Sequence, residues 1–183
     1  MATDTLKIGS TSPNFNLPGV DGKYYSIETF KDKKGLVIIF SCNHCPYVQA
    51  YEDRIKKIQS DYGKKGIGLV AINSNDSDQY EDDSFDNMKK RALEKGFNFP
   101  YLRDEEQSTA KAFGASHTPE IFLFDMERKL VFHGKIDDNW KDKLKVKSQY
   151  LRDAIEELLA GEEISVPETF TIGCTVKWKS QNN

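Results

Sequence analysis

Two mainly apolar runs, at residues 36–41 and 67–72, stand out along the chain. Both are rich in β-branched side chains, which is typical of strands buried on both faces of a sheet. Between them, residues 43–62 are apolar at intervals of three and four positions, the pattern of a helix with one buried face. A buried strand, a helix and a second buried strand predict a right-handed parallel βαβ unit.

The same alternation continues toward the C-terminus. A helix is predicted from an N-cap at Ser84 to Gly96, and a short helical piece ends near Gly114. Residues 120–125 and 130–136 predict a β-hairpin, and a last helix is predicted near residues 148–160. Strands that alternate with helices, followed by a hairpin and a helix, predict an α/β fold with a central mixed sheet flanked by helices.

Both ends of the chain add to this core. Between residues 7 and 30, short apolar pieces with several prolines and glycines predict an N-terminal β-hairpin that turns at residues 20–23. No low-complexity linker divides the chain, so we expect one domain over residues 1–183, with residues 161–183 as a C-terminal tail. The acidic run at residues 81–83 is expected to be a solvated lead-in to the helix after it.

Charge and hydropathy exclude two classes of partner. The net charge is −3 at pH 7, whereas a protein that follows a phosphate backbone is normally basic. The longest apolar stretch, residues 67–72, is far shorter than the roughly 20 residues that cross a bilayer. We therefore expect neither nucleic acid nor a membrane as a partner. The first residues lack the apolar segment of a secretory signal, so we expect a cytoplasmic protein.

Cys42 and Cys45 carry the clearest chemistry, in the sequence Cys-Asn-His-Cys-Pro at positions 42–46. Three cysteines are too few for a disulfide framework, but a pair three positions apart, between a buried strand and a helix, can act as a dithiol. A helix N-terminus lowers the pKa of a thiol from its free value of about 8.5. We expect Cys42 at the mouth of the site, exposed and nucleophilic, and Cys45 on the inward face as a sheltered resolving thiol.

His44 stands between the two cysteines. When it is protonated, its positive charge favours the Cys42 thiolate and stabilises the reduced form of the pair. We therefore expect a reduction potential less negative than that of thioredoxin, which is about −270 mV.

These features together resemble the thioredoxin fold. The likeness rests on the Cys-Asn-His-Cys-Pro sequence after a buried strand, on Thr118 and Pro119 before a second strand, and on the βαβ-then-ββα order. It covers roughly residues 8–160. The extra N-terminal hairpin resembles the redoxin branch that includes the alkyl hydroperoxide reductase and thiol-specific antioxidant proteins. Residues 172–178 are similar to a feature of one uncharacterised redoxin subfamily.

The resemblance implies roles for particular residues. It implies that Pro119 is preceded by a cis peptide bond and packs beside the disulfide, and that the backbone of Thr118 pairs with an incoming peptide. It also implies a thiol–disulfide oxidoreductase with an antioxidant or redox-homeostasis role. In such an enzyme the redox-active disulfide joins Cys42 to Cys45.

The chain departs from its relatives at two points. Thioredoxins carry a buried acid in the strand before the motif, which manages the proton of the second cysteine, and residues 36–40 contain no ionisable side chain. Glu120, directly after Pro119, is the candidate substitute; the alternative is a solvated strand end. Peroxiredoxins place a threonine three residues before the cysteine that attacks peroxide, and neither Cys42 nor Cys45 has one, which weakens a peroxidase interpretation.

The expected chemistry is thiol–disulfide exchange. The Cys42 thiolate attacks a substrate disulfide to form a mixed disulfide. Cys45 then attacks that sulfur, releases reduced product and leaves Cys42 and Cys45 oxidised. This chemistry requires no organic cofactor and no metal. The expected partners are a disulfide-containing protein or a small disulfide as substrate, and a reductase or small thiol that restores the dithiol.

Several alternatives stay open. In a thiol-dependent peroxidase, Cys42 would attack peroxide and Cys45 would resolve the sulfenic acid. In a copper carrier resembling the copper-delivering thioredoxin-fold proteins, His117 would join the two thiolates around Cu(I). A zinc site would need a second ligand pair, which is missing. Cys174 either folds back as a further resolving thiol or is simply packed or exposed, and residues 137–140 form either a gate or a turn with an aromatic anchor.

Overall fold

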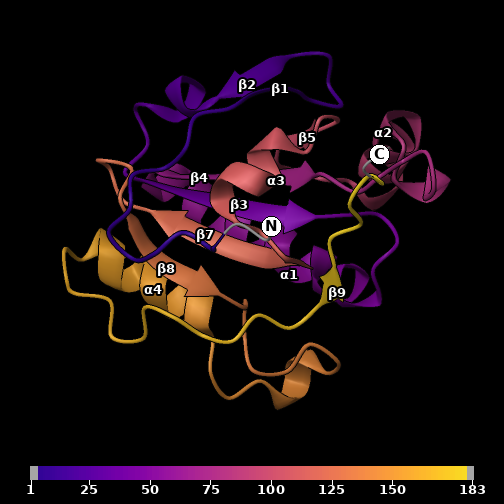
Figure 1. Cartoon of the computed structure of the whole chain (residues 1–183). Helices are drawn as coiled ribbons and strands as arrows, with labels where there is room; N and C mark the ends of the chain where they lie inside the picture. The colour runs from indigo at the N-terminus through magenta and orange to yellow at the C-terminus, as the bar shows by residue number, and fades with distance from the viewer. Residues whose placement is uncertain (1–3, 181–183) are drawn as a thin grey trace.

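The computed structural model describes residues 4–180, and a five-stranded mixed sheet lies at its centre (Figure 1). The strand order is β5-β4-β3-β7-β8, with β3 parallel to β4 and antiparallel to β7. This confirms the expected α/β fold with a central mixed sheet. The strands are β3 (Gly35–Ser41), β4 (Ile67–Asn73), β5 (Tyr101–Arg103), β7 (Glu120–Phe124) and β8 (Leu130–Gly134).

The central strand β3 is apolar from Leu36 to Phe40, because its alternate side chains enter hydrophobic cores on opposite faces of the sheet. Val37 and Ile39 pack into a core on one face of the sheet, shared with three helices. Leu36 and Ile38 pack into a second core on the other face, against another helix and the N-terminal segment. Neighbouring side chains of a strand point to opposite faces, so a strand covered on both faces needs apolar residues throughout.

The helices cover both faces of the sheet. α1 and α4 pack on the first core through Ile55 and Ile155, and α2 joins them through Met88. α3 packs on the second core through Phe113. Within residues 4–180, no helix combines the length and apolar character that crossing a bilayer requires. The α-helices are α1 (Pro46–Tyr62), α2 (Phe85–Lys95), α3 (Ser108–Phe113) and α4 (Tyr150–Leu159), and the short 3-10 helices are η1 (Ile27–Phe30), η2 (Gly63–Lys65), η3 (Glu81–Asp83) and η4 (Lys143–Lys145).

The start of α1 differs from the sequence expectation. The periodicity suggested a helix from residue 43, whereas α1 begins at Pro46. Proline fits the first helical position because its missing N–H is not needed there. The residue before it, Cys45, is extended (φ −102°, ψ 121°) and forms the N-cap. The helix N-terminus therefore lies at the second cysteine of the motif.

The N-terminal hairpin is present as expected. β1 (Asn16–Pro18) pairs with β2 (Tyr24–Ser26) in antiparallel register. Gly22 in the connecting turn has a φ of +82°, a conformation that glycine adopts without a steric penalty.

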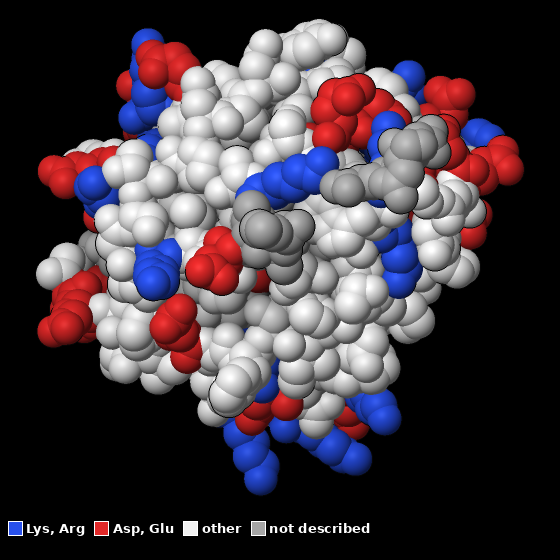
Figure 2. Space-filling model, in the orientation of Figure 1, with Lys and Arg blue, Asp and Glu red and all other residues white. Residues whose placement is uncertain are grey.

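The C-terminal tail returns to the body of the protein. After α4 it runs beside β8, where the Thr169 N–H donates to the His133 carbonyl. It then forms β9 (Cys174–Thr175), which pairs in antiparallel register with β6 (His117–Thr118). Figure 1 shows the yellow tail passing from α4 to β9 and on toward α2. Figure 2 shows mostly uncharged residues on the surface around β9.

Candidate active site

The two cysteines of the motif lie between β3 and α1, and both are buried. Cys42 follows directly after β3 and is 3% exposed, and Cys45 is 1% exposed. The expected contrast between an exposed and a sheltered sulfur is therefore wrong for this structure. Part of the cover comes from a segment remote in sequence, because Cys174 packs against the cluster that the two cysteines form with Val48. The neighbouring Tyr47 packs against the same cluster.

Thr118 contacts both sulfurs of the pair. Its Oγ1 lies 3.4 Å from the Cys42 sulfur. Its carbonyl oxygen lies 3.2 Å from the Cys45 sulfur, and a protonated Cys45 donates a hydrogen bond to it. The peptide bond between Thr118 and Pro119 is cis, as the family resemblance implies. The sequence-predicted residues Cys42, Cys45 and Thr118 thus meet at one site.

The electrostatics of the pair favour a thiolate on Cys45. The pKa of Cys42 is raised, because its thiol hydrogen-bonds to Cys45, because it is buried, and because the charge of Asp83 acts on it. The pKa of Cys45 is lowered to about 4, chiefly by the hydrogen bond from Cys42 and against the effect of burial. Cys174 and the backbone of Val48 stabilise the same sulfur further. Cys45 is also the N-cap of α1, whereas the sequence analysis expected the thiolate on Cys42.

Cys174 is the third sulfur of the site. It lies opposite Thr118 in the β6–β9 pair. Burial and its hydrogen bond to Cys45 raise the pKa of Cys174 to about 11. Cys174 therefore stays protonated at neutral pH and donates to the Cys45 sulfur. Of the two alternatives for Cys174, the structure has the one in which the tail folds back onto the pair.

His44 lies at the surface. Its side chain is 70% exposed, and its Nδ1 atom is 3.0 Å from a carboxylate oxygen of the equally exposed Asp82. That carboxylate offsets the charge that His44 gains on protonation. The charges that raise the pKa of Cys42 are the negative ones of Asp83 and Cys45. His44 is thus paired with Asp82, and its predicted effect on the Cys42 thiolate stays a prediction.

A buried polar cluster, which we call the Asp83 cluster, fixes the turn that carries the motif. Asp83 is 1% exposed. The sequence suggested that the whole acidic run before α2 is solvated, and this is wrong for Asp83. Its carboxylate accepts hydrogen bonds from the Asn43 backbone N–H (2.6 Å) and from the side-chain amides of Asn73 (3.0 Å) and Asn75 (2.9 Å). The Tyr101 hydroxyl donates to the Asn43 side chain at 2.7 Å. Buried polar groups of this kind are stable when their partners are all present.

Glu120 is buried and organises the loop that carries Thr118. One carboxylate oxygen lies 2.7 Å from Nε2 of His133, and the other accepts from the N–H groups of Ser116 (2.7 Å) and His117 (3.0 Å). Burial raises the pKa of Glu120, but the His133 hydrogen bond and the two amides outweigh it and hold the pKa below its ordinary value. Glu120 is thus not a solvated strand end. Its carboxylate contacts Ser116, His117 and His133, so any effect of Glu120 on the sulfurs is transmitted through the loop that carries Thr118.

The ligands that the copper hypothesis requires do not converge. Within residues 4–180, no group of three or more His, Cys, Asp or Glu residues is arranged to hold a metal ion. Nδ1 of His117 lies 2.8 Å from the Ser116 hydroxyl, and the His117 backbone pairs with Thr175. Cys42, Cys45 and His117 therefore do not form a Cu(I) site in this structure.

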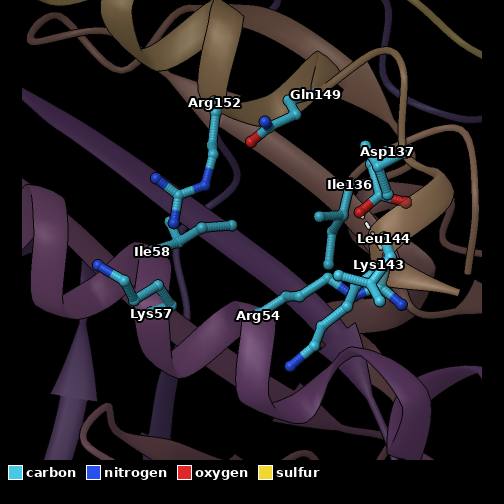
Figure 3. Close-up of a pocket in the computed structure, with 10 residues that line it drawn as sticks. Arg54, Lys57, Ile58, Ile136, Asp137, Lys143, Leu144, Gln149 and Arg152 are labelled. Atoms are coloured by element: carbon cyan, nitrogen blue, oxygen red, sulfur yellow. Dashed lines mark hydrogen bonds and ion pairs between the residues drawn. The ribbon is translucent and has the colours of Figure 1, made fainter.

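Residues 137–140 form an anchored turn beside the site. The ring of Trp140 lies 4.2 Å from that of Tyr47, and Asp137 accepts from Tyr51 (2.8 Å) and Arg54 (2.6 Å). A separate pocket opens nearby, and Figure 3 shows side chains from α1 and α4 facing it. None of the three cysteines is among the residues that line this pocket, so the sulfur site lies elsewhere.

Comparisons with known proteins agree with this geometry. The chain is 26% identical over 128 residues to the thiol-disulfide oxidoreductase ResA of Geobacillus thermodenitrificans, covering 68% of this chain and 67% of that protein. A crystal structure of an uncharacterized conserved protein from Geobacillus kaustophilus superimposes with a TM-score of 0.92 at 40% identity, covering 98% of this chain and 96% of that one.

A second crystal structure, of a hypothetical protein from Sinorhizobium meliloti 1021, gives a TM-score of 0.91 at 35% identity, covering 97% of this chain and 98% of that one. The sequence model of the Redoxin family matches residues 7–150. The match spans most of the chain, including both cysteines of the pair, Thr118 and Glu120. The protein therefore belongs to the redoxin family.

Proposed function

We propose that this protein is a thiol–disulfide oxidoreductase whose redox pair is Cys42 and Cys45. The observation that carries the proposal is the shared position of the two sulfurs against Thr118, with Cys42 3.4 Å from its Oγ1 and Cys45 3.2 Å from its carbonyl oxygen. The ResA relatives, which are named thiol-disulfide oxidoreductases, support the same activity.

The hydrogen bond between the two sulfurs determines how the pair reacts. Cys45 holds the negative charge at rest, and it takes the Cys42 proton when Cys42 attacks a substrate disulfide. One substrate sulfur then joins Cys42, and the other leaves as a thiolate. That thiolate accepts the proton from Cys45, which attacks Cys42, forms the Cys42–Cys45 disulfide and releases the second substrate sulfur as a thiolate. The two electrons that reduce the substrate come from the pair.

Thr118, Pro119, His44 and Glu120 have different places in this proposal. Thr118 contacts both sulfurs, and β9 occupies its backbone edge, so an extended peptide substrate would pair there only after β9 moves aside. Pro119 and Glu120 shape the loop that carries Thr118. His44 is paired with Asp82 at the surface, and we assign it no step of the exchange.

The wider role follows from the chemistry. A dithiol that reduces disulfides in a protein or a small molecule contributes to redox homeostasis and so to defence against oxidation. It needs a reductase or a small thiol as electron donor. As a proposal, we assign this activity to a reducing compartment such as the cytoplasm, where such donors regenerate the dithiol.

Trapping of the mixed disulfide tests the proposal. With Cys174 replaced by serine in both proteins, Cys45→Ser is expected to hold a disulfide substrate on Cys42, because no second thiol can release it. The matched protein with Cys45 intact is expected to release the substrate and form the Cys42–Cys45 disulfide. Mass spectrometry after acid quenching measures both species. Absence of the adduct in the first protein and of the disulfide in the second would refute the activity.

Peroxidase activity is the competing chemistry within the same pair. The raised pKa of Cys42 and the absence of a threonine three residues before either cysteine disfavour it. We expect hydrogen peroxide to oxidise the reduced protein no faster than it oxidises a free thiol, as measured by stopped-flow kinetics. A substantially faster rate would establish the peroxidase instead.

A further inference from the structure

The tail places a third sulfur against the redox pair. In the β6–β9 pairing, Cys174 lies opposite Thr118, the residue that contacts both Cys42 and Cys45. The Cys174 side chain packs against the cluster of the two cysteines and Val48. The side chain and the backbone of Cys174 also help to lower the pKa of Cys45. The sulfur that Cys174 meets is thus the one that resolves the mixed disulfide.

The chain around Cys174 is built for this close approach. A Cβ atom on Gly173 would lie 2.1 Å from the Thr118 carbonyl oxygen, so a larger residue cannot occupy that position without moving the tail. After β9, the Val176 N–H donates to the Ser116 carbonyl at 2.9 Å. The Lys177 N–H then donates to the Asn75 side chain at 2.9 Å. Cys174 is therefore held near the pair by attachments at Thr169 before it and at Val176 and Lys177 after it.

The three sulfurs also differ in their access to solvent. Cys42 and Cys45 are buried, whereas Cys174 is partly exposed. An external reductant consequently meets Cys174 more easily than either member of the pair. A route for electrons from the surface to the buried pair would pass through this residue.

We infer that Cys174 is a third redox cysteine that exchanges with the Cys42–Cys45 disulfide and forms a disulfide with Cys45. The inference rests on the proposed function, because it starts from the oxidised pair. It gives β9 the position of a tethered substrate, since its strand occupies the backbone edge of Thr118 to which an incoming peptide would pair.

The exchange is balanced in atoms and electrons. The Cys174 thiol loses its proton to solvent and attacks the Cys45 sulfur. A bond forms between Cys45 and Cys174 while the bond between Cys42 and Cys45 breaks, and Cys42 leaves as a thiolate that takes up a proton. No net oxidation occurs. The oxidising equivalent moves from the buried pair to the partly exposed tail, where an external thiol can reduce it.

A cysteine variant isolates the new bond. Full-length Cys42→Ser is equilibrated in glutathione buffers of increasing oxidised fraction, quenched with acid and alkylated. We expect Cys45 and Cys174 to lose their thiols together and to carry no glutathione, because the internal disulfide forms. The matched control, Cys42→Ser with Cys174→Ser, is expected to retain glutathione on Cys45. A glutathione adduct on Cys45 of the single variant, or persistence of both thiols, would overturn the inference.

The unmodified chain provides a second measurement that does not depend on a variant. After oxidation and acid quenching, peptide mapping is expected to find a Cys45–Cys174 disulfide with Cys42 free, beside the Cys42–Cys45 disulfide. The Cys174→Ser variant distinguishes failure of the proposed function from failure of the inference about Cys174. If it forms no Cys42–Cys45 disulfide, the proposed function fails. If it forms that disulfide but the unmodified chain never links Cys174, the inference alone fails.

Discussion

The redox pair lies between two regions that are built very differently. On one side, the Asp83 cluster holds the turn after β3 with a buried carboxylate and three hydrogen-bond donors. On the other side, the tail cover, which we define as β6 with β9, is a pairing of two residues on each strand. The first region is held by a buried carboxylate with three donors, and the second by one short strand pair. The comparison indicates a rigid support for the sulfurs under a displaceable cover.

Removal of the Asp83 carboxylate should have the largest effect, because it breaks the rigid side. Asp83→Ala leaves the Asn43 N–H and the amides of Asn73 and Asn75 without their acceptor in a buried site. We expect the free energy of unfolding to fall by about 3 to 5 kcal/mol. Urea denaturation measures it, with the exposed Asp86→Ala as control. A loss below about 1 kcal/mol would show that the support is not rigid.

Glu120 sharpens the comparison, because it supports the loop on which the tail cover lies. Its folded pKa is below the ordinary value of 4.5, so its stabilising effect is complete above that value and is lost as the pH falls through the lower folded pKa. We expect Glu120→Gln to lower the free energy of unfolding at neutral pH by about 1 to 3 kcal/mol. Its stability should also depend less on pH below about pH 5.

Denaturation curves measured from neutral to acid pH test this expectation. Glu162→Gln, a change at an exposed glutamate, serves as the control. Because other acidic residues also titrate in this range, the informative quantity is the difference between the variant and the unmodified chain. Parallel pH profiles for the two proteins would show that Glu120 does not contribute to the pH dependence of stability.

Gly173 tests the displaceable side. A Cβ atom there would meet the Thr118 carbonyl at 2.1 Å, so Gly173→Ala should move β9 away from β6. We expect alkylation of Cys42 and Cys45 to become at least about tenfold faster, since local opening of the cover would be favoured by about 1.4 kcal/mol. Ile172→Ala, a change at an exposed neighbour, should change the alkylation rate little. Equal alkylation rates in all three proteins would mean that the tail does not shield the sulfurs.

His44 should have the smallest effect, because it belongs to neither region. An exposed ion pair of this kind contributes about 0.2 to 1 kcal/mol. We expect His44→Ala to change the reduction potential of the pair by less than about 20 mV, given that about 30 mV corresponds to 1.4 kcal/mol. Redox titration in glutathione buffer measures the potential. A fall in the reduction potential of about 30 mV or more would show that His44 stabilises the Cys42 thiolate directly, as the sequence suggested.

The sequence predicts the strands and the helix that flank the site better than the tail cover. The apolar runs predict β3 and β4, and the periodicity predicts α1, because these depend on burial patterns within each segment. The burial of Cys42 is invisible in that pattern, because β9 covers it from far along the chain.

Two predictions from local sequence were wrong, one for the start of α1 and one for the acidic run before α2. The start of α1 was placed too early because the apolar period extends back past Pro46, and this moved the helix N-terminus from Cys45 toward Cys42. In the acidic run before α2, Asp82 is exposed while the adjacent Asp83 is buried. Neighbouring residues of one composition can thus have opposite environments, and only the fold decides which of them turns inward.

The attachments on both sides of β9 have a kinetic consequence. Thr169 is bonded to β8 and Lys177 to Asn75, so the short chain between them limits how far the Cys174 sulfur can travel. The thiol stays beside its reaction partner at every protein concentration. Its exchange with Cys45 should therefore be a first-order process with a half-life that dilution leaves unchanged, which separates it from transfer between two molecules.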